Sequence, residues 1–388
     1  MRRRLGLLAI ILVALVAGDR LMAAHEAAAR RANIRVGRFI TREEREGKHV
    51  AAVRIQDGTR RPELYISTQG MWRCATYHGA VASTDRITGL VEAIFEADGN
   101  VQSTDPAHAP DYGFVTGTEC AVTLHGPRVL VDPAHDMLFS FDLGNPTGDK
   151  EGCYVRRHGT SRVWAIDTNP RQMLAPRTGT DLPALLDPDL VPAAWLSSTK
   201  SIEHIAVRPE GGPSLELVLH HLKVNPEDMR MGKPESEWVL EGNGTERPTN
   251  RRSSMSFATY VLHAPFADVL DAAAYKGMEN ETARAALTLL PGEGAPLELR
   301  LENETSRGRP IVFNTVTHCV YEIEPDEAGL LFPTEVMLAS PTRDPWAGWL
   351  ELWEGLQAAQ GGIRGPAVGM PLSPQAIQAL LRQSAPAR

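Results

Sequence analysis

The stretch "VWAIDTNPRQMLAP", residues 163–176, is followed later by "VYEIEPDEAGLLFP", residues 320–333, which has the same length and nearly the same chemical pattern. When the two are aligned, Trp164 lies opposite Tyr321 and Asp167 lies opposite Glu324. A duplicated domain must repeat its earlier elements as well as this one. Four positions are identical: Val163, Ile166, Leu174 and Pro176 in the first copy, and Val320, Ile323, Leu331 and Pro333 in the second.

A second match lies around tryptophan. Trp72 follows the alternating stretch "PELYIS" and Trp238 follows "SLELVLHH", and each is followed by a helix-like segment. Trp238 lies 166 residues after Trp72, and Tyr321 lies 157 residues after Trp164. These offsets are close enough to indicate one duplication with small loop insertions. The two tryptophans are best explained as core anchors, since large aromatic side chains dominate the burial of apolar area.

The repeated unit therefore contains two strands, a strand carrying tryptophan, a helix and a run of strands. Period-two alternation predicts the strands, and Ser83 is the expected N-cap of a helix whose apolar residues recur every three or four positions. We predict an α+β fold of two tandem similar units, each a mainly antiparallel twisted sheet with a helix on one face. The expected segments are a first repeat at 48–178, a linker at 179–200 and a second repeat at 201–340.

Composition agrees with about two folded domains. The chain has 388 residues, of which 43% are hydrophobic and 23% charged, enough apolar material for two cores. Its formal net charge of −8 argues against nucleic acid as the main partner.

The beginning of the chain predicts a membrane or export segment over residues 1–35. Three arginines, Arg2 to Arg4, precede an apolar run from Leu5 to Gly18. The run is shorter than the ~20 residues of a spanning helix, which favours a cleaved signal peptide. The helix-forming "LMAAHEAAARRA" that follows favours a tilted signal anchor, the interpretation we prefer. Both place the bulk of the chain outside the cytoplasm, periplasmic or extracellular, and the anchor implies a single N-terminal span in a bacterial cell membrane.

In an exported protein, the four cysteines of the chain could form disulfides. Two disulfides are possible, with three pairings if all four residues are used, and buried free thiols are the alternative. Cys120 and Cys153 lie on two predicted strands of the first unit that could be neighbours, so we predict a disulfide between them.

The motif search predicts no catalytic residue, no cofactor and no metal. "SSTK", from Ser197 to Lys200, has the SxxK spacing of serine acyl-transfer enzymes but lacks their companion motifs. The adjacent residues His220 and His221 would face opposite sides of a strand and could not readily chelate one ion. His135, in "DPAHD", is better explained by a turn.

The C-terminal segment 341–388 combines a tryptophan-rich helix, a Gly/Pro spacer and a short terminal helix. Trp346, Trp349 and Trp353 recur at helical spacing. A helix covering the second sheet explains this pattern, and a helix that docks a partner or a membrane surface is the alternative that we list as a candidate site.

A family resemblance can now be stated. "DYGF" (Asp111 to Phe114), "YVRRHGTSRVWAI" and "WLSSTKSIEHIAV", with the basic, apolar N-terminus, resemble an uncharacterised membrane-anchored family whose genes often accompany gliding-motility-type ABC transporters in bacteria. The resemblance covers roughly residues 50 to 340. It implies an extracytoplasmic accessory protein of a membrane system and supplies no catalytic residues.

Two classes of function follow. The first is a non-catalytic, membrane-anchored accessory or scaffold subunit whose partners are integral membrane proteins. The second is an exported ligand-binding or hydrolytic protein with a site in the cleft between the units, its small-molecule ligand unknown. We favour the first because the sequence lacks a complete catalytic set.

Overall fold

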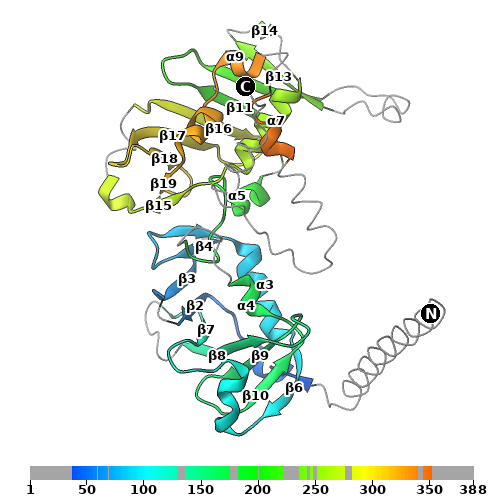
Figure 1. Cartoon of the computed structure of the whole chain (residues 1–388). Coiled ribbons are helices and arrows are strands. Elements are labelled where there is room, and N and C mark those ends of the chain that lie inside the picture. Colours follow the sequence, from blue (N-terminus) through cyan, green and yellow to red (C-terminus); the bar gives the residue numbers. More distant parts are fainter. Residues whose placement is uncertain are drawn as a thin grey trace, which may run out of the picture.

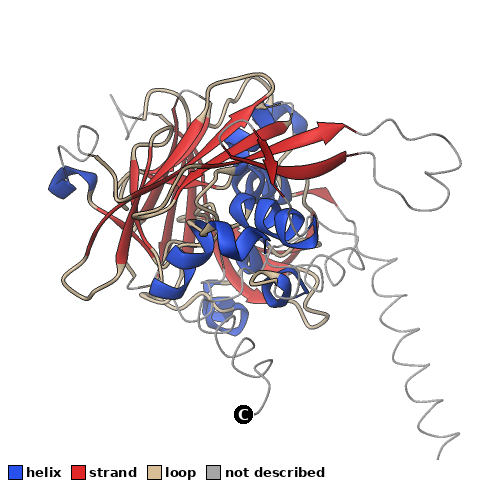
Figure 2. Cartoon of the chain, turned by 90° about the horizontal axis from the view of Figure 1, so that it is seen from above, coloured by secondary structure: helices blue, strands red, loops and turns tan. Residues whose placement is uncertain are grey.

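The computed structural model describes residues 37–351 apart from residues 59, 69, 130–135, 175–181, 200, 222–235, 243–244, 248–250, 276–281 and 340–343. In these residues the chain forms two antiparallel sheets, one of ten strands and one of nine, stacked end to end (Figure 1). Seen from above, most helices gather on one side of the strands (Figure 2). The predicted mixed fold of two mainly antiparallel sheets is therefore confirmed.

The first unit precedes residue 175. Its strands follow the spatial order β1-β6-β10-β9-β8-β7-β2-β3-β4-β5. Its elements are β1 (Gly37–Arg38), α2 (Arg42–Arg45), β2 (Ala52–Asp57), β3 (Glu63–Thr68), β4 (Met71–Cys74), β5 (Ala80–Ala82), α3 (Thr84–Phe95), β6 (Asp98–Ser103), the 3-10 helix η1 (Pro106–Tyr112), β7 (Cys120–His125), β8 (Met137–Pro146), β9 (Cys153–Arg157), β10 (Val163–Ile166) and α4 (Pro170–Met173).

The second unit has the strand order β15-β19-β18-β17-β16-β11-β12-β13-β14, which repeats that of the first without β1. Its elements are α5 (Ala193–Ser198), β11 (Ile202–Arg208), β12 (Leu215–His221), β13 (Ser236–Gly242), β14 (Thr245–Arg247), α7 (Arg251–Leu262), β15 (Asp268–Leu270), the 3-10 helix η2 (Ala272–Tyr275), β16 (Ala285–Pro291), β17 (Leu297–Glu304), β18 (Pro310–Asn314), β19 (Cys319–Glu322), α8 (Pro325–Leu331) and α9 (Glu335–Ala339).

Strand register places the predicted matches at equivalent positions. Trp72 lies opposite Ser67 of β3, and Trp238 lies opposite Leu219 of β12. Trp238 is 8% exposed and Trp72 packs partly buried against the core. The 166-residue offset read from the sequence is thus a true structural correspondence.

Helix α3 forms as its sequence predicts. The Ser83 hydroxyl accepts a hydrogen bond from the Arg86 amide and caps the first turn. Its apolar stripe buries Ile87, Leu90 and Ile94 completely. Each such side chain contributes about 1.5–3 kcal/mol by leaving water, so the stripe holds the helix on the sheet.

Residues 182–199, which fall within the predicted linker, connect the two units. Leu186 bridges to Ala82 of β5, and Asp189 bridges to Pro265 before β15. From Asp189 onward the segment repeats the start of the first unit. The Phe39 amide donates to the carbonyl of Ala97, two residues beyond α3 (3.0 Å). In the same way, the Leu190 amide donates to the carbonyl of Ala264, two residues beyond α7 (2.8 Å).

The predicted disulfide is corrected by the strand order. Cys120 lies on β7 and Cys153 on β9, and β8 runs between these two strands. Strands two places apart are about 9–10 Å apart, whereas disulfide-bonded Cα atoms lie within about 7 Å. Both residues carry free, buried thiols, as do Cys74 and Cys319.

The docking role predicted for the tryptophan-rich segment is also corrected. Trp346 is fully buried and Trp349 is 6% exposed. Their rings contact Phe257 and Tyr260 of α7, with centroids 5.2 and 5.1 Å apart. They complete the core of the second unit, because the helical face they share covers α7. Trp353 lies outside the described residues.

The predicted N-terminal segment 1–35 likewise lies outside the described residues. Among the helices that the structure describes, none is long and apolar enough to cross a membrane.

Candidate functional site

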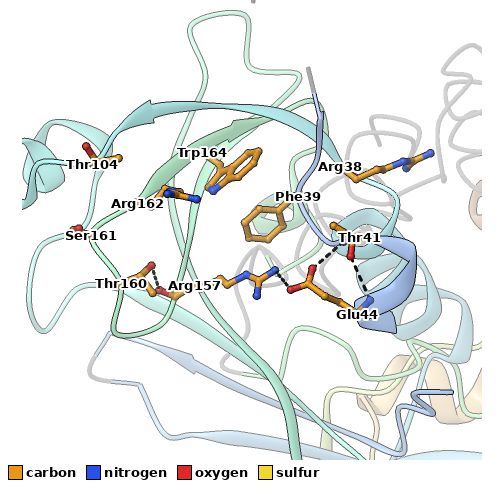
Figure 3. A pocket seen from close by; sticks show the side chains of 10 residues that line it. All are labelled: Arg38, Phe39, Thr41, Glu44, Thr104, Arg157, Thr160, Ser161, Arg162 and Trp164. Atoms are coloured by element: carbon orange, nitrogen blue, oxygen red, sulfur yellow. Dashed lines mark hydrogen bonds and ion pairs between the residues drawn. The ribbon is translucent and has the colours of Figure 1, made fainter. Parts of the chain in front are cut away.

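A hollow of about 820 Å³ opens at the end of the first sheet that lies farthest from the second unit (Figures 1 and 3). We call it the β9–β10 groove because the turn between these strands forms one wall. The start of the described chain and α2 form the opposite wall. It is lined by Arg38, Phe39, Thr41, Glu44, Thr104, Arg157, Thr160, Ser161, Arg162 and Trp164.

Two aromatic rings form the apolar part of the groove. Phe39 and Trp164 meet edge to face with their centroids 5.8 Å apart. Phe39 is 3% exposed and also contacts Phe141 of the core, whereas Trp164 is half-buried. The groove therefore offers a rigid aromatic surface held from below by the core.

One wall is fixed by an ion pair. Arg157 donates to Glu44 (2.6 Å), and Glu44 also accepts from the Thr41 amide (2.9 Å) in the capping box of α2. Burial acts to raise the pKa of the Glu44 carboxyl, but the hydrogen bonds from Thr41 and Arg157 outweigh it and hold the pKa below its usual value. Glu44 is therefore ionised at neutral pH and holds α2 against β9.

The other two arginines differ in their partners. Arg38 forms ion pairs with Glu96 (3.1 Å) and Asp98 (3.3 Å). Arg162 is exposed and forms no hydrogen bond or ion pair with any residue that the structure describes. It lies beside exposed Thr160 and Ser161, so the groove offers an uncompensated guanidinium next to hydroxyl groups and an aromatic face (Figure 3). This combination suits a carboxylate joined to an apolar group.

The sequence did not single out these residues. Arg157 and Arg162 belong to "YVRRHGTSRVW", but no local pattern distinguishes a binding arginine from a solvated one. Phe39 and Glu44 precede the expected start of the first unit at residue 48. The groove exists only because the chain brings residues 38–44 beside residues 157–164.

The residues considered earlier for catalysis lie elsewhere. The Ser197 hydroxyl donates to the Ala193 carbonyl within α5 (2.8 Å), and Lys200 lies outside the described residues. His220 contacts Glu241 on the neighbouring strand (3.3 Å), and His135 lies outside the described residues. Among the described residues, no group of three or more His, Cys, Asp or Glu side chains is placed to hold a metal ion.

A second hollow, of about 520 Å³, lies on the outer face of the first sheet. At its rim His158 Nδ1 lies 2.7 Å from the carboxylate of Asp142, which also accepts from Arg156 (2.8 Å) and is 1% exposed. Ser140 lines the hollow too, but its hydroxyl pairs with that of Thr123 (3.0 Å). The period-two alternation of β8 and β9 places these polar residues on one face, a signal that the sequence search did not use.

Comparison with known proteins finds one similarity. No curated protein matches the chain, and no solved structure matches it. The segment from Trp72 in β4 to residue 224, just beyond β12, matches a family model, so it spans most of the first unit, the join and the first strands of the second. Residues 72–224 are similar to the family described as "Domain of unknown function (DUF4340)".

Proposed function

We propose that the protein is a non-catalytic accessory or scaffold subunit of a bacterial membrane complex, anchored by residues 1–35, with both sheet units outside the cytoplasm. In this proposal the β9–β10 groove docks a partner protein. The observation that carries it is Arg162, which pairs with none of the residues that the structure describes and lies beside Trp164 and Phe39. One wall of this groove is the first described strand after the N-terminal segment.

The charges of the groove favour recognition over chemistry. Glu44 and Arg157 neutralise each other, and Arg38 is held by two acidic residues. Arginine and tryptophan are the residue types that most often anchor protein interfaces. The groove therefore fits an extended or hairpin segment that carries a carboxylate and an apolar side chain.

The partner class follows from the expected anchor. A chain held at the membrane meets integral membrane proteins at high local concentration, so weak contacts are enough for assembly. The resemblance to the family associated with gliding-motility-type ABC transporters supports a transporter subunit as that partner. The match to the DUF4340 model is consistent with an uncharacterised family of this kind.

The experiment is a pull-down of the tagged full-length protein from detergent-solubilised native membranes, with mass spectrometry of the recovered proteins. The variants are Arg162→Glu and Trp164→Ala, with Arg307→Glu, an exposed arginine of the second unit, as the matched control. Stoichiometric membrane subunits that are lost in both groove variants and kept in the control support the proposal. Recovery of the wild-type protein alone contradicts it.

A second candidate is an exported ligand-binding or hydrolytic protein. The observation that favours it is the His158–Asp142 pair at the rim of the outer hollow, since a histidine oriented by a buried carboxylate is a common acid–base arrangement. The Ser140 hydroxyl is hydrogen-bonded to that of Thr123 and not to His158, so this site favours ligand binding over acyl transfer by a serine nucleophile. A small molecule that raises the melting temperature of the wild type and not of His158→Ala would support this candidate.

A further inference from the structure

A row of polar side chains crosses four neighbouring strands, β2, β7, β8 and β9, on the outer face of the first sheet (Figure 1). Register places Arg54 of β2 opposite Thr123 of β7, and Thr123 opposite Ser140 of β8. Just beyond β9, the His158 amide donates to the Ser140 carbonyl (3.0 Å) and extends the row by one strand. All four residues line the outer hollow. Two short hydroxyl side chains therefore form its floor, between a guanidinium and an imidazole.

The width of this row leaves room for a ligand. Neighbouring strands lie about 4.8 Å apart, so the backbones at Arg54 and His158 are separated by three such spacings, about 14 Å. Both side chains are long enough to lean over the hydroxyl groups between them. A small molecule on the floor of the hollow would therefore be within reach of both.

The hydrogen-bond donors of the row are not used up by the fold. Arg54 is exposed and forms no hydrogen bond or ion pair with any residue that the structure describes. The Nδ1 atom of His158 faces Asp142 (2.7 Å), so its Nε2 atom is the one left for a ligand. The Thr123 and Ser140 hydroxyls bond each other (3.0 Å), and because one donates, the hydrogen of the other is left over. None of the described residues that line the hollow is acidic.

His125 adds a buried ring to the hollow without adding charge. It is 7% exposed, and burial, with a smaller effect of Arg54, lowers the pKa of its imidazole against the opposing effect of Asp136. The ring is therefore neutral at pH 7. Its Nδ1 atom is buried and has no hydrogen-bond partner among the described residues. Such unpaired atoms are uncommon in folded proteins, so this part of the hollow also has hydrogen-bonding capacity that the fold does not use.

The second unit repeats this face of the sheet without the basic residues. The amide bond of His158 has its match in Thr315, whose amide donates to the carbonyl of Glu298 (3.0 Å). Glu298 of β17 lies opposite Thr288 of β16, and Thr288 lies opposite Ala206 of β11. These strands occupy the places of β8, β7 and β2 in the repeated strand order.

This internal comparison separates the needs of the fold from those of a ligand. Ala206 stands at the position of Arg54, and Glu298 stands at the position of Ser140. The same sheet is thus built with no basic residue in this row and with an acidic residue in its middle. The fold does not require Arg54 and His158, and their convergence on one hollow points to an anionic ligand.

We infer that the outer hollow binds the phosphoryl group of a small phosphate ester, held by Arg54, His158 and the Thr123–Ser140 hydroxyl pair. The three terminal oxygen atoms of a phosphoryl group point in different directions and can accept from donors on separate strands. A carboxylate has two oxygen atoms in one plane and matches a single guanidinium better than it matches this row. The volume of about 520 Å³ also has room for the rest of the ester.

The inference rests on the second candidate function in one respect, since both assign a ligand to the outer hollow. It names the chemical class of that ligand. It does not depend on the docking role of the β9–β10 groove, which is lined by other residues.

The test is isothermal titration calorimetry of the full-length protein in a phosphate-free detergent at low ionic strength, with glycerol 1-phosphate as the probe. We expect saturable binding by the wild type. Arg54→Gln and His158→Gln should each weaken binding by about tenfold, because each removes a hydrogen bond to a charged group. Thermal melts show that each variant remains folded.

Two matched variants serve as controls and should leave binding unchanged. Arg307→Gln removes an exposed arginine of the second unit. His108→Gln removes a histidine whose side chain is 61% exposed, as that of His158 is. The Nδ1 atom of His108 likewise faces a carboxylate, that of Asp111 (3.2 Å), but this residue does not line the hollow.

Two further probes identify the chemistry and its source. Glycerate carries a carboxylate on a similar scaffold and should bind at least about tenfold more weakly than glycerol 1-phosphate. Lysophosphatidic acid in the same micelles presents the phosphoryl group on a lipid. Tighter binding of this lipid than of glycerol 1-phosphate assigns the hollow to a lipid headgroup, and equal or weaker binding assigns it to a soluble ester.

The inference is overturned by a wild type that does not bind glycerol 1-phosphate, by binding that Arg54→Gln leaves unchanged, or by equal binding of glycerate. A different small molecule whose stabilising effect depends on His158 would then keep the second candidate function without the phosphoryl group. The accessory role is tested separately, because its pull-down uses the Arg162 and Trp164 variants of the β9–β10 groove. Phosphate binding with no membrane subunit recovered would remove that role and leave this site standing.

Discussion

Trp164 and Tyr321 occupy the same position in the two sheets, yet Trp164 is half-buried and Tyr321 is 2% exposed. The fold is the same around both rings. The difference arises because the second unit is covered at this end and the first is open.

Because the two rings differ in burial, replacing each by alanine should lower the free energy of unfolding by a different amount. Tyr321→Ala should lower the free energy of unfolding by about 3–5 kcal/mol, since it removes a fully packed ring. Trp164→Ala should lower it by less than half of that amount, because part of the ring is already solvated. Urea unfolding of the two variants checks this, and equal losses would mean that the two ends are equally packed.

Removal of the Asp142 carboxylate should cause a large loss of stability. Asp142 is buried between Arg156 and His158, so Asp142→Ala removes the buried one of the two carboxylates that pair with Arg156, the other being Glu119 (2.7 Å). We expect a loss of about 3 kcal/mol in urea unfolding. Asp111→Ala is the control, because Asp111 is exposed and, among the described residues, forms an ion pair with exposed His108. This variant should change stability by less than about 0.5 kcal/mol. Similar losses in both variants would contradict the prediction.

Glu327 predicts a pH dependence of stability. Burial raises the pKa of its carboxyl to about 8, and its Oε2 atom is buried without a hydrogen bond from the described residues. Between about pH 4.5 and pH 8 the unfolded chain has lost this proton and the folded chain keeps it. Unfolding releases a proton in this window, so this group lowers stability as pH rises, by at most about 1.4 kcal/mol per pH unit, and the effect levels off above pH 8.

Glu327→Gln should remove that slope. The measurement is urea unfolding at pH 5, 6, 7 and 8 for the wild type, for Glu327→Gln and for Asp326→Asn, an exposed neighbour on α8. The Asp326 variant should keep the wild-type slope. Parallel curves for all three proteins would show that Glu327 ionises normally in the folded state.

The buried cysteine thiols should react slowly with alkylating reagents in the folded protein. Burial raises the pKa of Cys120 and of Cys153 to about 12, and that of Cys74 to about 11. Because the thiolate is the reactive form, iodoacetamide should label these residues only after denaturation. Mass spectrometry of unreduced digests should recover Cys120 and Cys153 in separate peptides, and a linked pair would contradict the strand order.

Trp346, in the C-terminal segment 341–388, should stabilise the core of the second unit. Trp346 is fully buried, and its indole N–H donates to the Leu330 carbonyl (3.1 Å). Trp346→Ala should cost about 3–5 kcal/mol. A truncation at residue 344 should therefore destabilise the second unit as well as remove any contact beyond it. Unchanged urea unfolding of Trp346→Ala would mean that the ring is dispensable for the core.

Several features followed from local pattern alone. Helix α3 begins after its predicted cap, Ser83, because an N-cap and an apolar stripe are properties of neighbouring residues. The duplication was visible because Trp72 and Trp238, and then Trp164 and Tyr321, keep their places relative to the strands around them.

Other features depended on which strands become neighbours. Alternation marks Cys120 and Cys153 as strand residues, but only the assembled sheet places β8 between them. The groove joins residues more than 110 positions apart, such as Glu44 and Arg157, and no local signal connects them.

The sequence by itself determined the two sheets, the repeated order of their elements and the capped helix of the first unit, because period, capping and duplication are written in short stretches. Only the tertiary structure decided that the thiols stay apart, that Trp346 and Trp349 are buried, and that the end of the second sheet at Tyr321 is covered while the equivalent end of the first sheet at Trp164 is open. These outcomes depend on long-range packing, in which a residue's exposure is set by the elements that cover it.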